Sequence, residues 1–86
     1  MTTPIRVIVA DDERPARAFL TELLRRHADV EIAGEAETGS DAVRLIEALT
    51  PDIAFLDLQM PELDGIGVVR LVKKTSLPLV IFVTAY

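Results

Sequence analysis

Three short segments of the chain are nearly continuous in apolar residues, and the first of them is rich in β-branched ones, a pattern typical of strands covered on both faces of a parallel sheet. They predict strands over residues 5–10, 53–58 and 79–83. Residues 30–36 are more polar but keep a strand-like pattern, and we expect another strand there. The chain therefore carries enough strands for one small sheet.

Between these strands, apolar residues recur every three or four positions, which predicts amphipathic helices. We expect helices over residues 14–27, over residues 42–49 after an opening at residues 39–41, and from residue 65 or 66 to residue 74. One face of the first helix is expected to bury Ala16, Phe19, Leu20, Leu23 and Leu24. The other face would carry Arg17, Glu22, Arg25 and Arg26.

Strict alternation of strands and helices predicts an α/β domain with an open parallel sheet, because parallel strands need crossover connections. Right-handed crossovers then place helices on both faces of the sheet. Three strand–helix units and a final strand fill the 86 residues, without a repeat or a linker. We therefore expect one domain.

Acidic residues stand at the carboxyl ends of the predicted strands. Asp11 and Asp12 follow the first strand, and Asp57 lies near the end of the third. Thr84 follows the fourth strand. Open parallel sheets bind ligands beyond the carboxyl ends of their strands, where the strand order reverses. If the first strand is central, these four residues should meet at one rim.

Three carboxylates at one rim would repel one another strongly. Two unit charges 4 Å apart repel by roughly 4 kcal/mol at an effective dielectric constant near 20. A hard divalent cation would relieve this repulsion, and oxygen donors without His or Cys suit Mg²⁺ or Mn²⁺. One oxygen of Asp57 could then bind the metal while the other attacks phosphorus, with Thr84 holding an oxygen of the arriving phosphoryl group.

Each of these residues also has a purely structural interpretation. Asp11 or Asp12 would cap the first helix, and Asp57 would bind the amides of the loop that follows it. Asp64 and Gly65 are most simply explained by the chemistry of a turn and a helix start. The coincidence of the three other acids at one rim favours a metal site over separate structural roles.

Composition narrows the function classes. The 14 acidic side chains outnumber the 9 basic ones, and no run of Lys or Arg marks a nucleic-acid surface. The absence of cysteine excludes disulfides and thiolate metal sites. The amino terminus shows no secretory signal, and the longest apolar run, residues 79–83, is too short to span a bilayer. We expect a cytoplasmic protein that does not insert into membranes.

The motifs VIVADDE, FLDLQMPELDG and VTAY, at the ends of the first, third and fourth strands, resemble those of the receiver domains of two-component response regulators. The resemblance covers all 86 residues and implies a flavodoxin-like, CheY-like fold. The segment DDERPARAFLTELL and the ending TAY also resemble receivers of the LytTR class, whose output domain binds DNA. Residues 1–86 would then be the N-terminal part of a receiver domain, without an output domain.

The resemblance implies a role for each acidic residue at the rim. Asp57 would be the phosphoryl acceptor, Asp12 a direct ligand of Mg²⁺ or Mn²⁺, and Asp11 a ligand through water. Gln59 would supply its main-chain carbonyl to the metal.

The resemblance also implies how the site is supplied and switched. Thr84 would move its hydroxyl toward the phosphoryl group, and the small Ala85 would leave access to it. The donor would be a phosphohistidine on a sensor histidine kinase. The chain would promote only its own phosphorylation and dephosphorylation, and would control transcription through an output region that it lacks.

The chain departs from the family at its end. Receivers continue with a fourth helix, a fifth strand ending in a lysine that contacts the phosphoryl group, and a fifth helix, none of which this sequence contains. Without that lysine we expect slow phosphorylation or weak coupling to a response. The fourth strand would be an uncharged sheet edge. We therefore expect edge pairing or swapping in a homodimer, or a retained part of a longer protein.

Three other functions remain as alternatives. A Mg²⁺-dependent small-molecule phosphatase or phosphotransferase would also use an Asp nucleophile, but the general acid expected two residues after Asp57 is replaced by Gln59. A dinucleotide-binding domain would need a glycine-rich turn after its first strand. In this chain that turn is formed by residues 11–14, which are all charged. The third alternative is an inactive truncated fragment.

Overall fold

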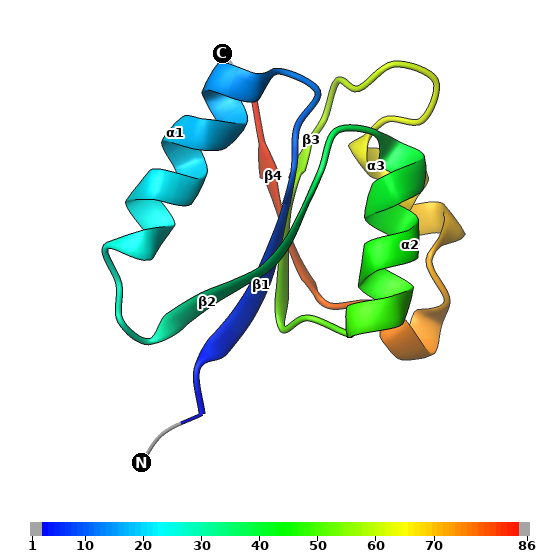
Figure 1. Ribbon diagram of the computed structural model, residues 1–86. Coiled ribbons are helices and arrows are strands. Elements are labelled where there is room, and N and C mark those ends of the chain that lie inside the picture. The colour runs from blue at the N-terminus through cyan, green and yellow to red at the C-terminus, as the bar shows by residue number, and fades with distance from the viewer. Residues whose placement is uncertain (1–2, 85–86) are drawn as a thin grey trace.

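The computed structural model describes residues 3–84, which alternate between strands and helices (Figure 1). The strands are β1 (Ile5–Ala10), β2 (Val30–Ala36), β3 (Ile53–Asp57) and β4 (Leu79–Val83). The helices are α1 (Arg14–Arg25), α2 (Gly39–Leu49) and α3 (Gly65–Leu71), and a short 3-10 helix, η1 (Lys74–Ser76), precedes β4. The predicted order of elements is confirmed.

All four strands pair in parallel in one sheet, in the order β2-β1-β3-β4. β1 is therefore an inner strand, as the rim prediction required, and the strand order reverses between β1 and β3. α1 lies on one face of the sheet, and α2 and α3 lie on the other (Figure 1). The predicted flavodoxin-like α/β fold is confirmed. Among residues 3–84, no helix has the length and apolar character needed to cross a bilayer.

The strand register determines which residues lie level at the carboxyl end of the sheet. The last paired residues of β1 and β3 are Ala10 and Leu56, so the residues that follow them, Asp11 and Asp57, lie level. On the other side, Asp57 pairs with Val83, the last residue of β4. Main-chain pairing alone therefore brings two distant acids to the same height on neighbouring strands.

The core lies between the sheet and the two helices α2 and α3. Ile8 and Leu56 from the sheet belong to one buried cluster with Ile46 of α2 and Val68 of α3. Burying an apolar side chain of this size stabilises the fold by about 1.5–3 kcal/mol. This face of the sheet is covered by α2 and α3, and the packing fixes β1 and β3, whose carboxyl ends carry the acidic residues.

The buried face of α1 differs from the prediction. Arg17 and Thr21, one turn apart, are the buried residues of this helix, whereas the sequence pattern assigned Arg17 to the polar face. Phe19, expected in the core, is 67% exposed. The prediction was wrong because α1 packs chiefly on β1 and β2, where Arg17 finds acidic partners, so part of the apolar stripe remains uncovered.

Several element boundaries also differ from the prediction. α2 begins at Gly39, earlier than expected, because the Thr38 hydroxyl accepts a hydrogen bond from the Asp41 amide (3.1 Å) and caps the helix. α3 ends at Leu71, earlier than expected, because the next residue, Val72, is extended. The first helix and the third strand are slightly shorter than predicted.

The start of α2 packs directly against the loop that follows β3. A Cβ atom on Gly39 would collide with the main-chain carbonyl oxygen of Leu63. Glycine is otherwise a poor helix former, so its presence at this position reflects the close approach of the two backbones. The loop after the acidic strand end is thereby held from the side of α2.

Candidate functional site

Asp11, Asp12 and Asp57 meet at the carboxyl ends of β1 and β3. One carboxylate oxygen from each lies within 4.8 Å of the corresponding oxygens of the other two. Asp11 and Asp57 are partly buried, and Asp12 is exposed. At an effective dielectric constant near 20, two unit charges at about this distance repel by roughly 3–4 kcal/mol. The three acids form an anionic cluster that is costly when fully ionised.

Local hydrogen bonds orient two of these carboxylates. Asp11 Oδ1 accepts a hydrogen bond from the Glu13 amide (2.9 Å), and Asp57 Oδ1 accepts one from the Gln59 amide (3.0 Å). The second bond is the loop contact that a structural interpretation of Asp57 predicts. Neither Asp11 nor Asp12 caps α1, because its N-cap residue is Glu13, which lacks a side-chain capping bond. The helix-cap alternative is therefore wrong.

A pocket opens beside the cluster. Its lining residues are Asp11, Glu13, Ala16, Asp57, Gln59, Val83 and Thr84. Gln59 and Thr84, both expected from the sequence, thus share one pocket with Asp57. Glu13 and Ala16 were missed by the sequence argument, although both lie close after the acid pair at the start of α1. Ala85, also expected here, lies outside the described residues.

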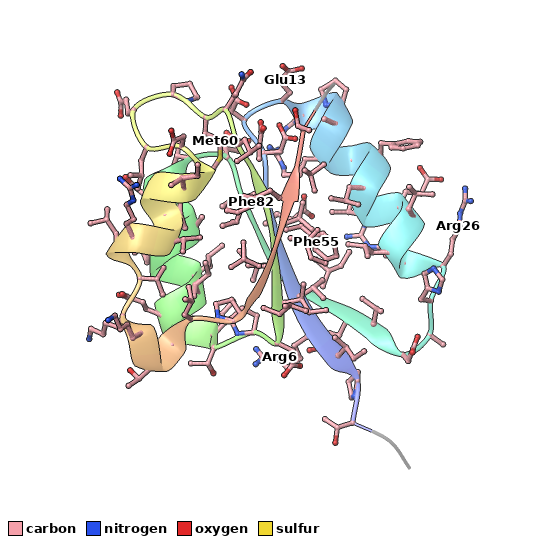
Figure 2. All side chains as sticks on the ribbon, turned by 180° about the vertical axis from the view of Figure 1, so that it is seen from behind. Arg6, Glu13, Arg26, Phe55, Met60 and Phe82 are labelled. Atoms are coloured by element: carbon pink, nitrogen blue, oxygen red, sulfur yellow. The ribbon has the colours of Figure 1, made fainter. Side chains whose placement is uncertain are left out.

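The backbone around Asp57 is packed tightly. A Cβ atom on Gly65, the first residue of α3, would lie 2.5 Å from the Asp57 carbonyl oxygen. The Asp64 side chain accepts a hydrogen bond from the Gly67 amide (2.8 Å) and caps α3, which confirms its predicted role at a helix start. Met60, which belongs to the loop between β3 and α3, is buried at the end of the sheet opposite Arg6 (Figure 2). Asp57 is therefore fixed by its neighbours rather than carried on a mobile loop.

The cluster has no positive partner among the described residues. Within residues 3–84, no basic side chain forms an ion pair with Asp11, Asp12 or Asp57. A set of carboxylate oxygens without nitrogen or sulfur donors suits hard divalent cations such as Mg²⁺ or Mn²⁺. The residues present therefore fit a divalent cation.

Burial raises the pKa of Asp57 above its ordinary value. The hydrogen bond from the Gln59 amide lowers the pKa, but the neighbouring carboxylates of Asp11 and Asp12 raise it further, and the net direction is upward. A carboxyl group whose pKa is raised by folding resists ionisation. Without a cation, an ionised Asp57 thus destabilises the folded chain.

Comparison with known proteins identifies the sequence family. The family described as response regulator receiver domain matches residues 7–86. An uncharacterized response regulatory protein of Yersinia pestis is 42% identical over 82 residues, which are 95% of this chain and 34% of that protein. The transcriptional regulatory protein BtsR of Salmonella typhi is 38% identical over 82 residues, again 95% and 34% of the two chains. The chain thus spans about a third of the length of these curated relatives.

A solved structure agrees with these matches. The response regulator domain of Thermotoga maritima CheB superposes with a TM-score of 0.87 at 34% sequence identity. The match covers 95% of this chain and 61% of that one. The similarity in fold and the similarity in sequence therefore indicate the same family.

Replacing Asp57 by Asn should raise the free energy of unfolding at neutral pH in the presence of a chelator. The folded chain holds the Asp57 proton more tightly than the unfolded chain, so stability falls as pH rises from about 4 through the raised pKa. The Asn variant escapes this loss, and its advantage should shrink as pH falls below about 4. Urea unfolding across this pH range measures the difference. Asp29→Asn, an exposed acid away from the cluster, is the control, and an equal gain there would contradict the prediction.

Proposed function

The chain belongs to the family of response regulator receiver domains, and on that basis we propose that it accepts a phosphoryl group on Asp57 in two-component signal transduction. The observation that carries the proposal is the meeting of three carboxylates, without a basic partner among residues 3–84, beside a pocket that Thr84 also lines. One relative is named a transcriptional regulatory protein, and we propose transcriptional control as the output.

In the proposed reaction, a carboxylate oxygen of Asp57 attacks the phosphorus of a phosphohistidine on a sensor histidine kinase. A P–O bond forms and the P–N bond breaks, and its electron pair returns to the imidazole nitrogen. The product is an acyl phosphate on Asp57. The Gln59 amide and the contact with Gly65 hold the acceptor in a fixed direction, which lowers the entropic cost of reaching the attack geometry.

The proposed cofactor is Mg²⁺ or Mn²⁺. Asp11, Asp12 and Asp57 would hold the ion, and the main-chain carbonyl of Gln59 is a further proposed ligand. When bound, such an ion offsets the negative charge that the carboxylates and the phosphoryl group bring together. The raised pKa of Asp57 is consistent with an acceptor that ionises favourably only beside a cation.

Two residues at the end of β4 are proposed to respond to phosphorylation. Thr84 lines the pocket, and a threonine hydroxyl can donate a hydrogen bond to a phosphoryl oxygen. The proposed role of Ala85, a small residue that leaves access to the site, rests on the family resemblance alone.

We further propose that residues 1–86 act as a phospho-accepting module and not as an enzyme with a separate substrate. The kinase, the output domain and the cytoplasmic location expected from the sequence all belong to this proposal. The small-molecule phosphatase alternative is less well supported, because Gln59 lines the pocket where a general acid would be required.

Incubation with Mg²⁺ and acetyl phosphate should add a single phosphoryl group to the chain, as read by intact-mass spectrometry. The transfer breaks the P–O bond of the donor and releases acetate. Asp57→Ala should gain nothing, and Asp29→Asn should gain the group as the unsubstituted chain does. Continuous release of inorganic phosphate at a high rate, without accumulation of the phosphorylated chain, would favour the phosphatase alternative instead.

Mg²⁺ should raise the melting temperature at neutral pH, because the ion binds the folded cluster and not the unfolded chain. At a free Mg²⁺ concentration 100 times the dissociation constant, the free energy of unfolding should rise by about 2.7 kcal/mol. Asp12→Ala should reduce this gain, and Asp29→Asn should retain it. A melting temperature indifferent to Mg²⁺ would contradict the metal site.

Among residues 3–84, β4 is an edge of the sheet, and we propose it as the site of homodimer formation. Its five residues carry no charge, and Leu79, Ile81 and Phe82 are exposed. The opposite edge, β2, carries Glu31 and has an irregular register, both of which discourage pairing. A two-fold pairing of β4 with itself brings no like charges together. We therefore propose that a second copy of this chain pairs along β4.

Sedimentation velocity should show dimers that increase with protein concentration. Ile81→Lys, at the centre of β4, should shift the population to monomers, because a buried ammonium at the pairing edge is unfavourable. Ala28→Lys makes the same charge change at an exposed position outside the strand and should leave dimers intact. An unsubstituted chain that stays monomeric at every concentration would contradict edge pairing, and a dimer that survives Ile81→Lys would point to swapping instead.

A further inference from the structure

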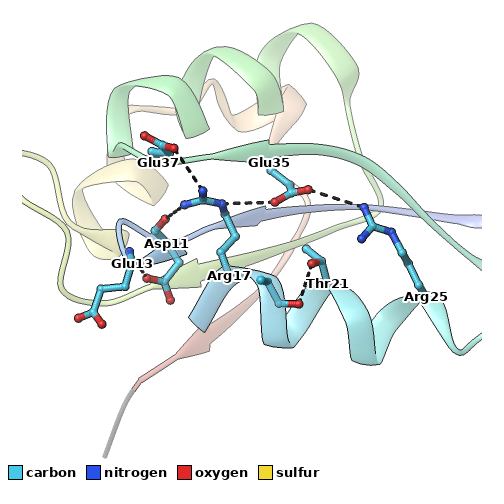
Figure 3. Close-up of polar contacts among 8 residues, drawn as sticks. Asp11, Glu13, Arg17, Thr21, Arg25, Glu35 and Glu37 are labelled. Atoms are coloured by element: carbon cyan, nitrogen blue, oxygen red, sulfur yellow. Dashed lines mark hydrogen bonds and ion pairs between the residues drawn. The ribbon is translucent and has the colours of Figure 1, made fainter. Parts of the chain in front are cut away.

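Arg17 is a buried arginine that links three parts of the chain beside the acidic cluster (Figure 3). Its Nη1 donates a hydrogen bond to the main-chain carbonyl oxygen of Asp11 (2.6 Å). Its Nε lies 3.3 Å from Glu35 Oε1, and its Nη2 lies 3.2 Å from Glu37 Oε1. The whole guanidinium is thus engaged, and its side chain is only 8% exposed.

The charge of Arg17 is fully compensated by its own partners. Glu35 also pairs with Arg25 (3.8 Å), so the network contains two arginines and two glutamates, and +2 and −2 sum to zero. Arg17 forms no ion pair with a carboxylate of the cluster, although it contacts the backbone of Asp11. The arginine therefore fixes the backbone at the site but does not neutralise the carboxylates of the cluster.

The contact holds the Asp11 backbone from both sides. The Asp11 amide donates a hydrogen bond to the Ala36 carbonyl oxygen (3.0 Å), and the Asp11 carbonyl accepts one from Arg17. That carbonyl belongs to the peptide group joining Asp11 to Asp12, so fixing it restricts the direction in which both carboxylates leave the chain. Buried polar groups held on every side in this way are rigid.

We infer that Arg17 is a positioning residue, which orients the Asp11–Asp12 peptide so that both acids face Asp57 around a divalent cation. This inference rests on the proposed metal site and names a residue that acts on it through the backbone. Outer partners of metal ligands that fix their orientation typically change metal affinity by about 10–100-fold when removed.

If Arg17 is removed, a purely electrostatic role and a positioning role predict opposite changes in the affinity for Mg²⁺. Removing a positive charge near a cation site should tighten the binding of Mg²⁺ if charge alone matters. Removing a positioning contact should weaken binding. A merely structural role would lower the stability of the metal-free chain and leave the affinity of the folded fraction unchanged.

The test is an NMR titration with Mg²⁺, following the amide signals of Asp12 and Gln59. Arg17→Met, which keeps an apolar stem of similar length, should weaken the affinity by about tenfold. Arg25→Met, the control, removes one arginine of the same network without touching Asp11 and should leave the affinity unchanged or slightly tighter. A folded Arg17→Met that binds Mg²⁺ as tightly as the unsubstituted chain, or more tightly, overturns the inference.

A second variant covers the case in which Arg17→Met does not fold. Arg17→Lys keeps the charge but cannot form the same three contacts, so it should also bind Mg²⁺ more weakly. Unchanged affinity in a folded Arg17→Lys overturns the inference.

Hydrogen exchange in a chelator provides a measurement without the metal. In the folded variants, the Asp11 amide should exchange faster than in the unsubstituted chain, whereas the Asp52 amide, bonded to the Arg6 carbonyl at the other end of the sheet (2.8 Å), should keep its rate. Equal protection of the Asp11 amide in all chains overturns the inference. Failure of the unsubstituted chain to bind Mg²⁺ contradicts the proposed metal site, whereas binding that ignores Arg17 contradicts only this inference.

Discussion

Mutual repulsion among Asp11, Asp12 and Asp57 is the constraint on which the rest of the structure depends. Three carboxylate oxygens within 4.8 Å would separate if the chain allowed it. They stay together because the parallel register of β1 and β3 places two of them level, and the closed core beneath fixes that register. The stability of the core is thus used to maintain an unfavourable charge arrangement, which is typical of functional sites.

The loops and helix starts that follow the strands fix the backbone around Asp57 further. Gly65 lets the start of α3 lie against the Asp57 carbonyl, and Gly39 lets the start of α2 lie against the carbonyl of Leu63. The loop after Asp57 is therefore held by two helices, and its own residue Met60 is buried. Asp57, the proposed nucleophile, ends β3 just before this loop and keeps its direction without a ligand, so little order would have to be gained in the proposed phosphoryl transfer.

The strands and the acidic rim could be predicted from the sequence because both follow from local patterns and from topology. Apolar runs mark the strands, and strict alternation with helices places their carboxyl ends at one rim. The burial of Arg17 could not be predicted, because its partners Glu35 and Glu37 lie on a distant segment and its spacing places it on the polar face of α1. The contact between Gly39 and Leu63 was missed for the same reason, since a local pattern does not contain the approach of two backbones.

The pairing of Arg17 with two glutamates explains how a buried cation can lie beside an acidic site without neutralising it. An arginine with no other partner would be drawn to the nearest carboxylate, and a salt bridge to Asp11 would compete with any divalent ion. Glu35 and Glu37 satisfy Nε and Nη2, which leaves Nη1 for a neutral carbonyl oxygen. The negative charge of the cluster is thereby preserved while its backbone is fixed, and the proposed cation site would depend on both.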